Sequence, residues 1–192
     1  MFAVSEPSPF WTEFEQGPES KKRALLVTMR IIHNTGSRFD LGESRARLLL
    51  EEILSRPLFA HLATAVDTVP RESPVWFLWE EEAVWITGNS KTDSFPHRIE
   101  REPRCAIGIV DFDRTKGLVH HVGFRGRCQV LGHDKQRMIR LLSRYFGGQF
   151  ENWDPRFVKI LDDLDFIFIR FEPETAVVRD QSYRIKGAAE PC

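Results

Sequence analysis

The sequence predicts a mainly β, α+β domain, in which six or so antiparallel strands form a closed or nearly closed barrel with peripheral helices. Two observations lead to this prediction. Short runs rich in β-branched and aromatic residues recur along the chain and are separated by turn-forming residues. Amphipathic segments with helical spacing lie around these runs. Closure into a barrel would also remove the exposed edges of such a sheet.

The first three strands are expected at residues 58–66, 71–79 and 83–88, joined by the short turns DTVP and EEE. Their tight connections predict a three-stranded meander. Pro74 cannot donate to a hydrogen-bond ladder, so its strand is expected to be an edge or to carry a bulge there. Backbone amides near Pro74 would then be free for a ligand.

The segment 43–56 is expected to be an amphipathic helix that stops before Pro57. Its apolar side consists of Ala46, Leu49, Leu50, Ile53 and Leu54. Such a helix would cover one mouth of the barrel. The remaining strands are expected at 104–110, 118–131, 166–171 and 175–179.

Three more helices are expected. After the turn residues 89–94, Phe95 and Ile99 recur at helical spacing. Another amphipathic helix should span 134–146, where the Gly147-Gly148 pair ends it. The last should begin after Asp154, an N-cap residue that precedes a proline at the first helical position.

The start of the second strand, together with the third strand and the turn after it, suggests a phosphate site. Arg71, Thr87, Ser90 and Lys91 would bring a guanidinium, two hydroxyls and an ammonium group to one point, together with the free N–H groups of a helix start. A single arginine in a strand or a single lysine in a turn is more often a solvated surface charge. The combination therefore predicts an anion site only as a hypothesis.

The sequence resembles the pyridoxamine 5′-phosphate oxidase-like superfamily of FMN-binding split barrels. The resemblance lies in five segments in a shared order, LATAV, PRESPVWFLW with AVWITGNSK, RIEREPRCAIGIVD and FRGRCQVL, followed by a helix. It covers roughly residues 45–180. It implies a six- to seven-stranded antiparallel split β-barrel with peripheral helices, and FMN as the cofactor.

The resemblance also implies site residues. Arg71, Ser90 and Lys91 would hold the FMN phosphate. The isoalloxazine would be lined by Ser73, Pro74, Val75, Trp76, Ile86 and Thr87. His121 would reach the flavin from a partner subunit, because the family places FMN at the interface of a homodimer. His120 is adjacent in the strand and points to the opposite face, so at most one of the two histidines can face the flavin.

The chain departs from the family where true pyridoxamine phosphate oxidases bind their substrate. Trp76 stands where they carry a lysine, the Tyr145-Phe146 pair is followed by Gly-Gly-Gln, and the C-terminal VVRDQSYR lacks an Arg-x-His pair. A second phosphate would be strongly disfavoured without these cations. Activity as a true pyridoxamine phosphate oxidase is therefore not expected.

The composition fits a compact cytoplasmic protein. The chain has 192 residues, a formal net charge of −1 and 42% hydrophobic residues, which gives no electrostatic case for nucleic acid or a membrane surface as a partner. Its three cysteines lack CxxC spacing and its six histidines are scattered, so no metal site is expected. Cys105 and Cys128 are expected to be buried. GxSxG, P-loop and GxGxxG motifs are absent from the sequence.

The expected organisation is an N-terminal extension over 1–42, partly disordered or an arm, an FMN-binding domain over 43–183 and a mobile tail over 184–192. The leading hypothesis is a flavin-dependent oxidoreductase acting on a small, apolar or aromatic substrate near Trp76. Tyr145 or His121 could donate a proton, but the sequence assigns no catalytic residue. The alternatives are a deazaflavin-dependent reductase and a flavin- or haem-binding module without turnover.

Overall fold

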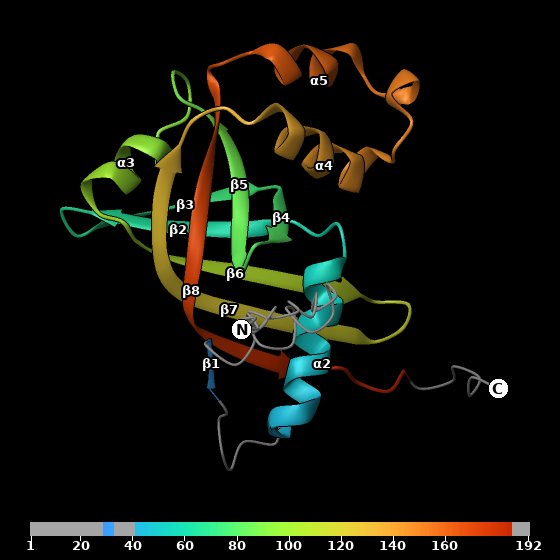
Figure 1. Cartoon of the computed structure of the whole chain (residues 1–192). Coiled ribbons are helices and arrows are strands. Elements are labelled where there is room, and N and C mark those ends of the chain that lie inside the picture. Colours follow the sequence, from blue (N-terminus) through green and yellow to red (C-terminus); the bar gives the residue numbers. More distant parts are fainter. Residues whose placement is uncertain (1–28, 33–40, 186–192) are drawn as a thin grey trace, which may run out of the picture.

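Eight strands form one curved sheet in the part of the chain that the computed structural model describes, residues 29–32 and 41–185 (Figure 1). The strand order is β3-β2-β6-β7-β8-β5-β4, and β1 pairs with β8 in parallel, whereas all other pairs are antiparallel. The strands are β1 (Arg30–Ile32), β2 (Ala60–Val66), β3 (Val69–Val75), β4 (Phe77–Glu80), β5 (Ala83–Asn89), β6 (Arg104–Asp113), β7 (Leu118–Leu131) and β8 (Phe166–Asp180). The mainly β, antiparallel architecture with peripheral helices is confirmed.

The expected meander is wrong: residues 58–89 form two separate hairpins. Strand β3 pairs with β2, and β4 pairs with β5, so the single strand expected over 71–79 is broken at Trp76. Both hairpins turn through two residues with positive φ, 52° and 63° at Asp67 and Thr68 and 49° and 66° at Glu81 and Glu82, which matches the twist of the flanking strands. Because β3 and β4 end the strand order, Pro74 lies in an edge strand, as predicted.

The two strands expected over 166–171 and 175–179 are one continuous strand, β8. Its register with β7 shifts between Arg125 and Gly126. A Cβ at Gly126 would lie 2.0 Å from the carbonyl oxygen of Glu172, so this close approach requires glycine. The bulge bends β8, which pairs with β5 through its first half and with β1 through its second half.

The main core fills the inside of the sheet beneath helix α2 (Gly42–Ser55). All five residues predicted for the apolar side of this helix are buried. They pack in one cluster with strand residues such as Leu62, Phe77, Ile107 and Phe124. Burial of this apolar surface is the main force that closes the barrel. Cys105 and Cys128 are free thiols buried in the same cluster, as expected.

The connection from β7 to β8 carries most of the remaining helices: α4 (Lys135–Phe146), η1 (Phe150–Asn152), α5 (Pro155–Lys159) and η2 (Ile160–Asp162). They lie together at one end of the molecule (Figure 1), and α4 contacts the C-terminal end of α2, where the guanidinium of Arg144 donates to the carbonyl of Leu54 at 2.8 Å. The N-cap predicted at Asp154 is confirmed, because its carboxylate accepts a hydrogen bond from the amide of Arg156. Asp134 caps α4 in the same way, through the amide of Arg137. Helix α4 packs on Trp85 and Phe168 in a second, smaller core.

Helix α3 (Phe95–Arg101) follows β5, as the spacing of Phe95 and Ile99 predicts. From the expected N-terminal extension, β1 adds to β8. The other predictions for residues 1–28, 33–40 and 186–192 lie outside the described residues. None of the helices in the described part has both the length and the apolar character needed to cross a membrane.

Candidate functional site

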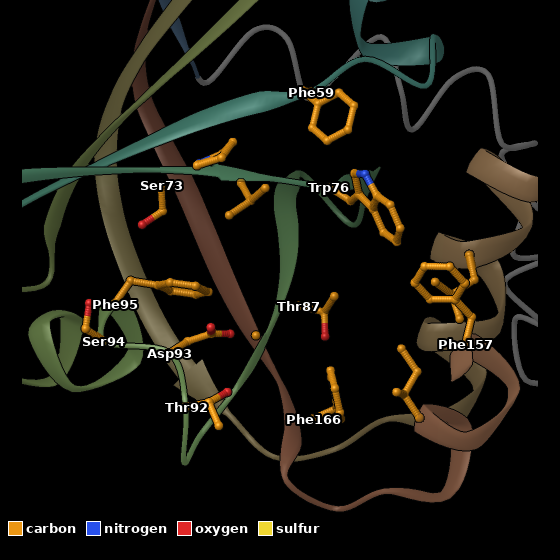
Figure 2. A pocket seen from close by; sticks show the side chains of 15 residues that line it. Phe59, Ser73, Trp76, Thr87, Thr92, Asp93, Ser94, Phe95, Phe157 and Phe166 are labelled. Atoms are coloured by element: carbon orange, nitrogen blue, oxygen red, sulfur yellow. The ribbon is translucent and has the colours of Figure 1, made fainter. Parts of the chain in front are cut away.

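A cavity of about 600 Å³ lies between the edge strand β3, the end of β5 and the helices that follow β7. Its volume is in the range that holds cofactors and other small molecules. The lining residues come from strands, helices and the segments between them and are Phe59, Ser73, Pro74, Val75, Trp76, Thr87, Gly88, Thr92, Asp93, Ser94, Phe95, Leu142, Phe157, Ile160 and Phe166. Figure 2 shows their side chains around the open space.

One end of the cavity is polar. Ser73, Thr87, Thr92, Asp93 and Ser94 bring four hydroxyl groups and one carboxylate to it (Figure 2). The hydroxyl of Thr87 donates to the carbonyl of Ile167 at 3.2 Å, which ties β5 to β8. The remaining hydroxyls can still donate to or accept from a ligand.

The other end is aromatic. Trp76 lies at the break between β3 and β4, where it stacks on Tyr145 at 5.1 Å between ring centroids and meets Phe146 edge-on at 5.2 Å. Phe59 and Phe157 complete the wall at 6.4 Å and 5.4 Å from Trp76. The cavity therefore suits a ligand with a polar end and a flat apolar end.

Gly88 brings the aromatic ring of Phe95 against the end of β5. A Cβ at Gly88 would lie 2.3 Å from the Cζ atom of Phe95, and the ring lines the cavity beside it. Glycine thus lets the first residue of α3 pack directly on the strand, which sets the distance between β5 and the turn before α3.

The amides of the turn at residues 89–93 are all hydrogen-bonded within the protein. The amide of Asn89 donates to the carboxylate of Asp93 at 2.6 Å, and the amides of Lys91 and Thr92 donate to the side-chain oxygen of Asn89. The amide of Ser90 donates to the carbonyl of Asp165 at 2.8 Å. The turn is therefore closed by its own side chains and by the segment before β8.

Of the two cationic side chains predicted to bind a phosphate, Lys91 forms an ion pair in the described part of the chain and Arg71 does not. The ammonium group of Lys91 lies 2.6 Å from a carboxylate oxygen of Asp165, and this hydrogen bond and the charge of Asp165 raise the pKa of Lys91. Arg71 is exposed on β3 two residues before Ser73, on the strand face that Ser73 and Val75 share. Its guanidinium has no side-chain partner within the described residues.

Comparison with known proteins shows the fold. No protein-family profile matches the chain, and no curated protein matches it either. The structure resembles a conserved hypothetical protein from Mycobacterium tuberculosis, with 17% identity, a TM-score of 0.60 and coverage of 81% of this chain and 99% of that one. It also resembles an F420 reductase, with 26% identity, a TM-score of 0.52 and coverage of 66% and 94%. The chain has the pyridoxamine 5′-phosphate oxidase-like split-barrel fold.

A third neighbour with this split-barrel fold is HutZ, a haem storage protein from Vibrio cholerae. The identity is 17%, the TM-score is 0.54, and the match covers 68% of this chain and 92% of HutZ. By their names, one of these neighbours is a reductase for F420, which is a deazaflavin, and another stores haem.

The split barrel brings together five of the ten residues predicted to bind a cofactor: Ser73, Pro74, Val75, Trp76 and Thr87 line the cavity. The side chain of Ile86 is fully buried in the main core, behind the wall of the cavity. Ser90 and Lys91 lie in the turn beside it but not in its lining.

His121 lies away from this cavity in the described chain, on the outer face of the sheet. It lines a second cavity of about 240 Å³ with Arg125 and Arg179. Burial and the charge of Arg179 lower the pKa of His121, and its buried Nδ1 atom has no hydrogen-bond partner among the described residues. His120 points to the core, as alternation predicts, with Nε2 at 3.5 Å from a carboxylate oxygen of Asp180.

Tyr145 is a structural residue rather than an available proton donor. Its hydroxyl donates to the carbonyl of Leu58 at 2.8 Å and accepts from the amide of Phe77 at 3.0 Å. Burial raises the pKa of Tyr145 above its usual range. The suggestion that Tyr145 donates a proton is therefore not supported by this geometry.

Sequence reasoning missed the residues that the helical connection contributes to the cavity, which are Leu142, Phe157 and Ile160. No local signal marks them, because they reach the cavity only through the packing of α4 and α5 on β4 and β5. Thr92, Asp93 and Ser94 were identified as turn and cap residues, and their place next to the predicted phosphate turn was a usable signal. In the described part of the chain, His, Cys, Asp and Glu side chains form no group suited to a metal ion.

Proposed function

We propose that this chain binds FMN in the cavity between β3, β5 and the α4–α5 connection, and that it is a flavin-dependent oxidoreductase. The observation that carries the proposal is the polarity of the cavity, with hydroxyls at one end and the Trp76 wall at the other. A flavin has a matching shape, because a flat, apolar ring system continues into a polyhydroxylated chain with a terminal phosphate. Bound flavin would supply the redox chemistry, and the protein would supply position and access.

In this proposal, the isoalloxazine lies along Ser73, Pro74, Val75 and Thr87, with Trp76 beside it. The phosphate end lies toward Arg71 and the turn that carries Ser90 and Lys91. The aromatic side chains leave room for a small, apolar or aromatic substrate over the ring. Cations for a substrate phosphate are lacking at Trp76, so we expect no pyridoxal phosphate formation at the rate of an authentic oxidase.

We also propose a homodimer with FMN at its interface, formed by the FMN-binding domain over residues 43–183. The outer face of β6 exposes Val110 and Phe112, at 49% and 60% of their surface, next to His121 on β7. A two-fold interface there would bury these apolar side chains and could bring His121 to the flavin of the partner. The reduced, buried Cys105 and Cys128 suit a cytoplasmic location.

A deazaflavin-dependent reductase is the second candidate, because an F420 reductase is 26% identical to this chain. A deazaflavin has a similar flat ring system, with a carbon in place of one ring nitrogen, and a phosphorylated side chain, so the same cavity can be proposed for it. Haem is less well supported in this cavity, since its described lining contains no histidine, cysteine or methionine that could ligate iron.

The deciding experiment is the visible absorption spectrum of the purified protein, followed by mass identification of the molecule that heat releases. Bound FMN supports the leading proposal, and bound deazaflavin supports the second candidate. A colourless protein that takes up neither of them nor haem contradicts the proposal.

A pair of variants then tests the position of the ring. Trp76→Leu should weaken the binding of FMN and of riboflavin equally, by about tenfold, because it removes a wall that faces the ring rather than the phosphate. Trp79→Leu is the matched control, since Trp79 packs against the main core and does not line the cavity. Equal losses in both variants would locate the flavin elsewhere.

A further inference from the structure

The contact between Lys91 and Asp165 joins the turn after β5 to the segment before β8, at the polar end of the cavity. Their charged atoms are 2.6 Å apart, and the carbonyl of Asp165 also accepts the amide of Ser90 at 2.8 Å. The amide of Asp165 in turn donates to the carboxylate of Asp163 at 3.0 Å, which fixes the segment. The backbone of Asp165 is thus held on both sides, while its carboxylate contacts Lys91.

Two carboxylates occupy the donors that a phosphate would use at this turn. Asp165 takes the ammonium group of Lys91, and Asp93 takes the amide of Asn89 at 2.6 Å. A phosphate that approached Lys91 would meet the negative charge of Asp165 and, at a greater distance, that of Asp163, whose charge also acts on Lys91. Like charges at this separation lower the affinity for a dianion.

The pair is also easy to separate. The side chains of Lys91 and Asp165 are 72% and 35% exposed, and ion pairs at such positions contribute little to stability. Lys91 can therefore leave Asp165 for a ligand without disturbing the fold. Arg71, by contrast, has no side-chain partner within the described residues, so its guanidinium is available to an anion.

We propose that Asp165 is a specificity-determining residue, which competes with the terminal phosphate of a bound flavin for Lys91. The inference rests on the proposed flavin site. It means that Lys91 adds less to the binding of the phosphate than an unpaired lysine would, so that any preference for FMN over the phosphate-free flavin comes mainly from Arg71.

The test compares FMN and riboflavin on the full-length chain, by titration of flavin fluorescence, before and after Asp165→Asn. The substitution keeps the size of the side chain and the backbone contact with Ser90 but removes the charge. We expect the Kd for FMN to fall about tenfold and the Kd for riboflavin to change by less than about twofold. In a Lys91→Met background the gain for FMN should be smaller.

Asp162→Asn is the control, because it removes the same charge from the same segment at a side chain that pairs with Lys135 instead. If Asp162→Asn lowers the Kd for FMN as much as Asp165→Asn does, the effect is a general one of net charge and the inference is wrong. If Asp165→Asn lowers the Kd for riboflavin as much as that for FMN, the substitution has opened the turn, and the inference is again wrong. If the parent chain binds both flavins but Asp165→Asn changes neither Kd, the inference is wrong and the proposed function stands. If no variant binds either flavin, the proposed function itself fails.

Discussion

The hydroxyl of Tyr145 lies between the carbonyl of Leu58 and the amide of Phe77, at 2.8 Å and 3.0 Å. Leu58 precedes β2 and Phe77 begins β4, so one side chain from α4 fastens the starts of two strands that do not pair with each other. The ring of Tyr145 also stacks on Trp76, with an interplanar angle of 22°. One residue therefore holds both the aromatic wall of the cavity and the contact between the two hairpins.

Tyr145→Phe should lower the free energy of unfolding by about 1–3 kcal/mol, because it leaves two backbone groups without their partner. It should not change the pH dependence of any flavin-linked turnover, since the hydroxyl is not a proton donor in this structure. Urea denaturation measures the first effect. The control is Tyr183→Phe at the only other tyrosine, which is 49% exposed and should change stability by less than about 0.5 kcal/mol. If the pH dependence of turnover changes in Tyr145→Phe but not in Tyr183→Phe, Tyr145 is a proton donor after all.

Local patterns predicted the helices well, and nonlocal pairing explains where prediction failed. The apolar side of α2 and the N-cap Asp154 depend on residues a few positions apart, and both are confirmed. The break at Trp76 was missed, because alternation along 71–79 does not show that the two halves pair with different strands.

The candidate site divides in the same way. The cavity residues of β3 and β5 were predicted through the resemblance and through their order along the chain. The closure of the turn by Asp165 was not, because Asp165 is 74 positions from Lys91 and approaches it only after β8 pairs with β5. The sequence shows which cations are present, but whether each is free depends on contacts of this kind.

Gly88→Ala should destabilise the protein by about 1–3 kcal/mol and weaken flavin binding, because the new Cβ would displace the ring of Phe95 from the end of β5. Thermal unfolding and flavin titration measure the two effects. Gly132→Ala is the matched control, since a Cβ there meets nothing within 4 Å. Wild-type flavin affinity in Gly88→Ala would mean that Phe95 does not shape the binding site.

Glu80 links the β4–β5 hairpin to α4 through Arg137 at 2.6 Å and Arg140 at 2.7 Å. Burial raises the pKa of Glu80, but the hydrogen bonds and charges of Arg140 and Arg137 lower it by more, so the pKa lies below its ordinary value of 4.5. A carboxyl group whose pKa is lowered by folding stabilises the protein above the unfolded pKa and loses this contribution as the pH falls through the folded pKa.

Glu80→Gln should therefore cost about 1 kcal/mol of stability at neutral pH, and the difference from the parent chain should shrink as the pH falls below 4.5. Urea denaturation at several pH values gives both numbers. Glu82→Gln, at an exposed neighbour in the same turn, should have little effect at any pH. A difference for Glu80→Gln that stays constant with pH would contradict a role for the ionised carboxylate.

Arg71→Gln should raise the Kd for FMN about tenfold or more and leave the Kd for riboflavin unchanged, because a charge-assisted hydrogen bond to the phosphate would be lost. The effect is opposite in sign to that expected for Asp165→Asn. Arg101→Gln is the control, since Arg101 is exposed at the end of α3 and pairs with Asp67 at 2.7 Å. Titration of both flavins decides the matter. A loss for riboflavin equal to that for FMN would mean that Arg71 supports the fold of β3 rather than the phosphate, and the phosphate end would then have to lie elsewhere along the cavity.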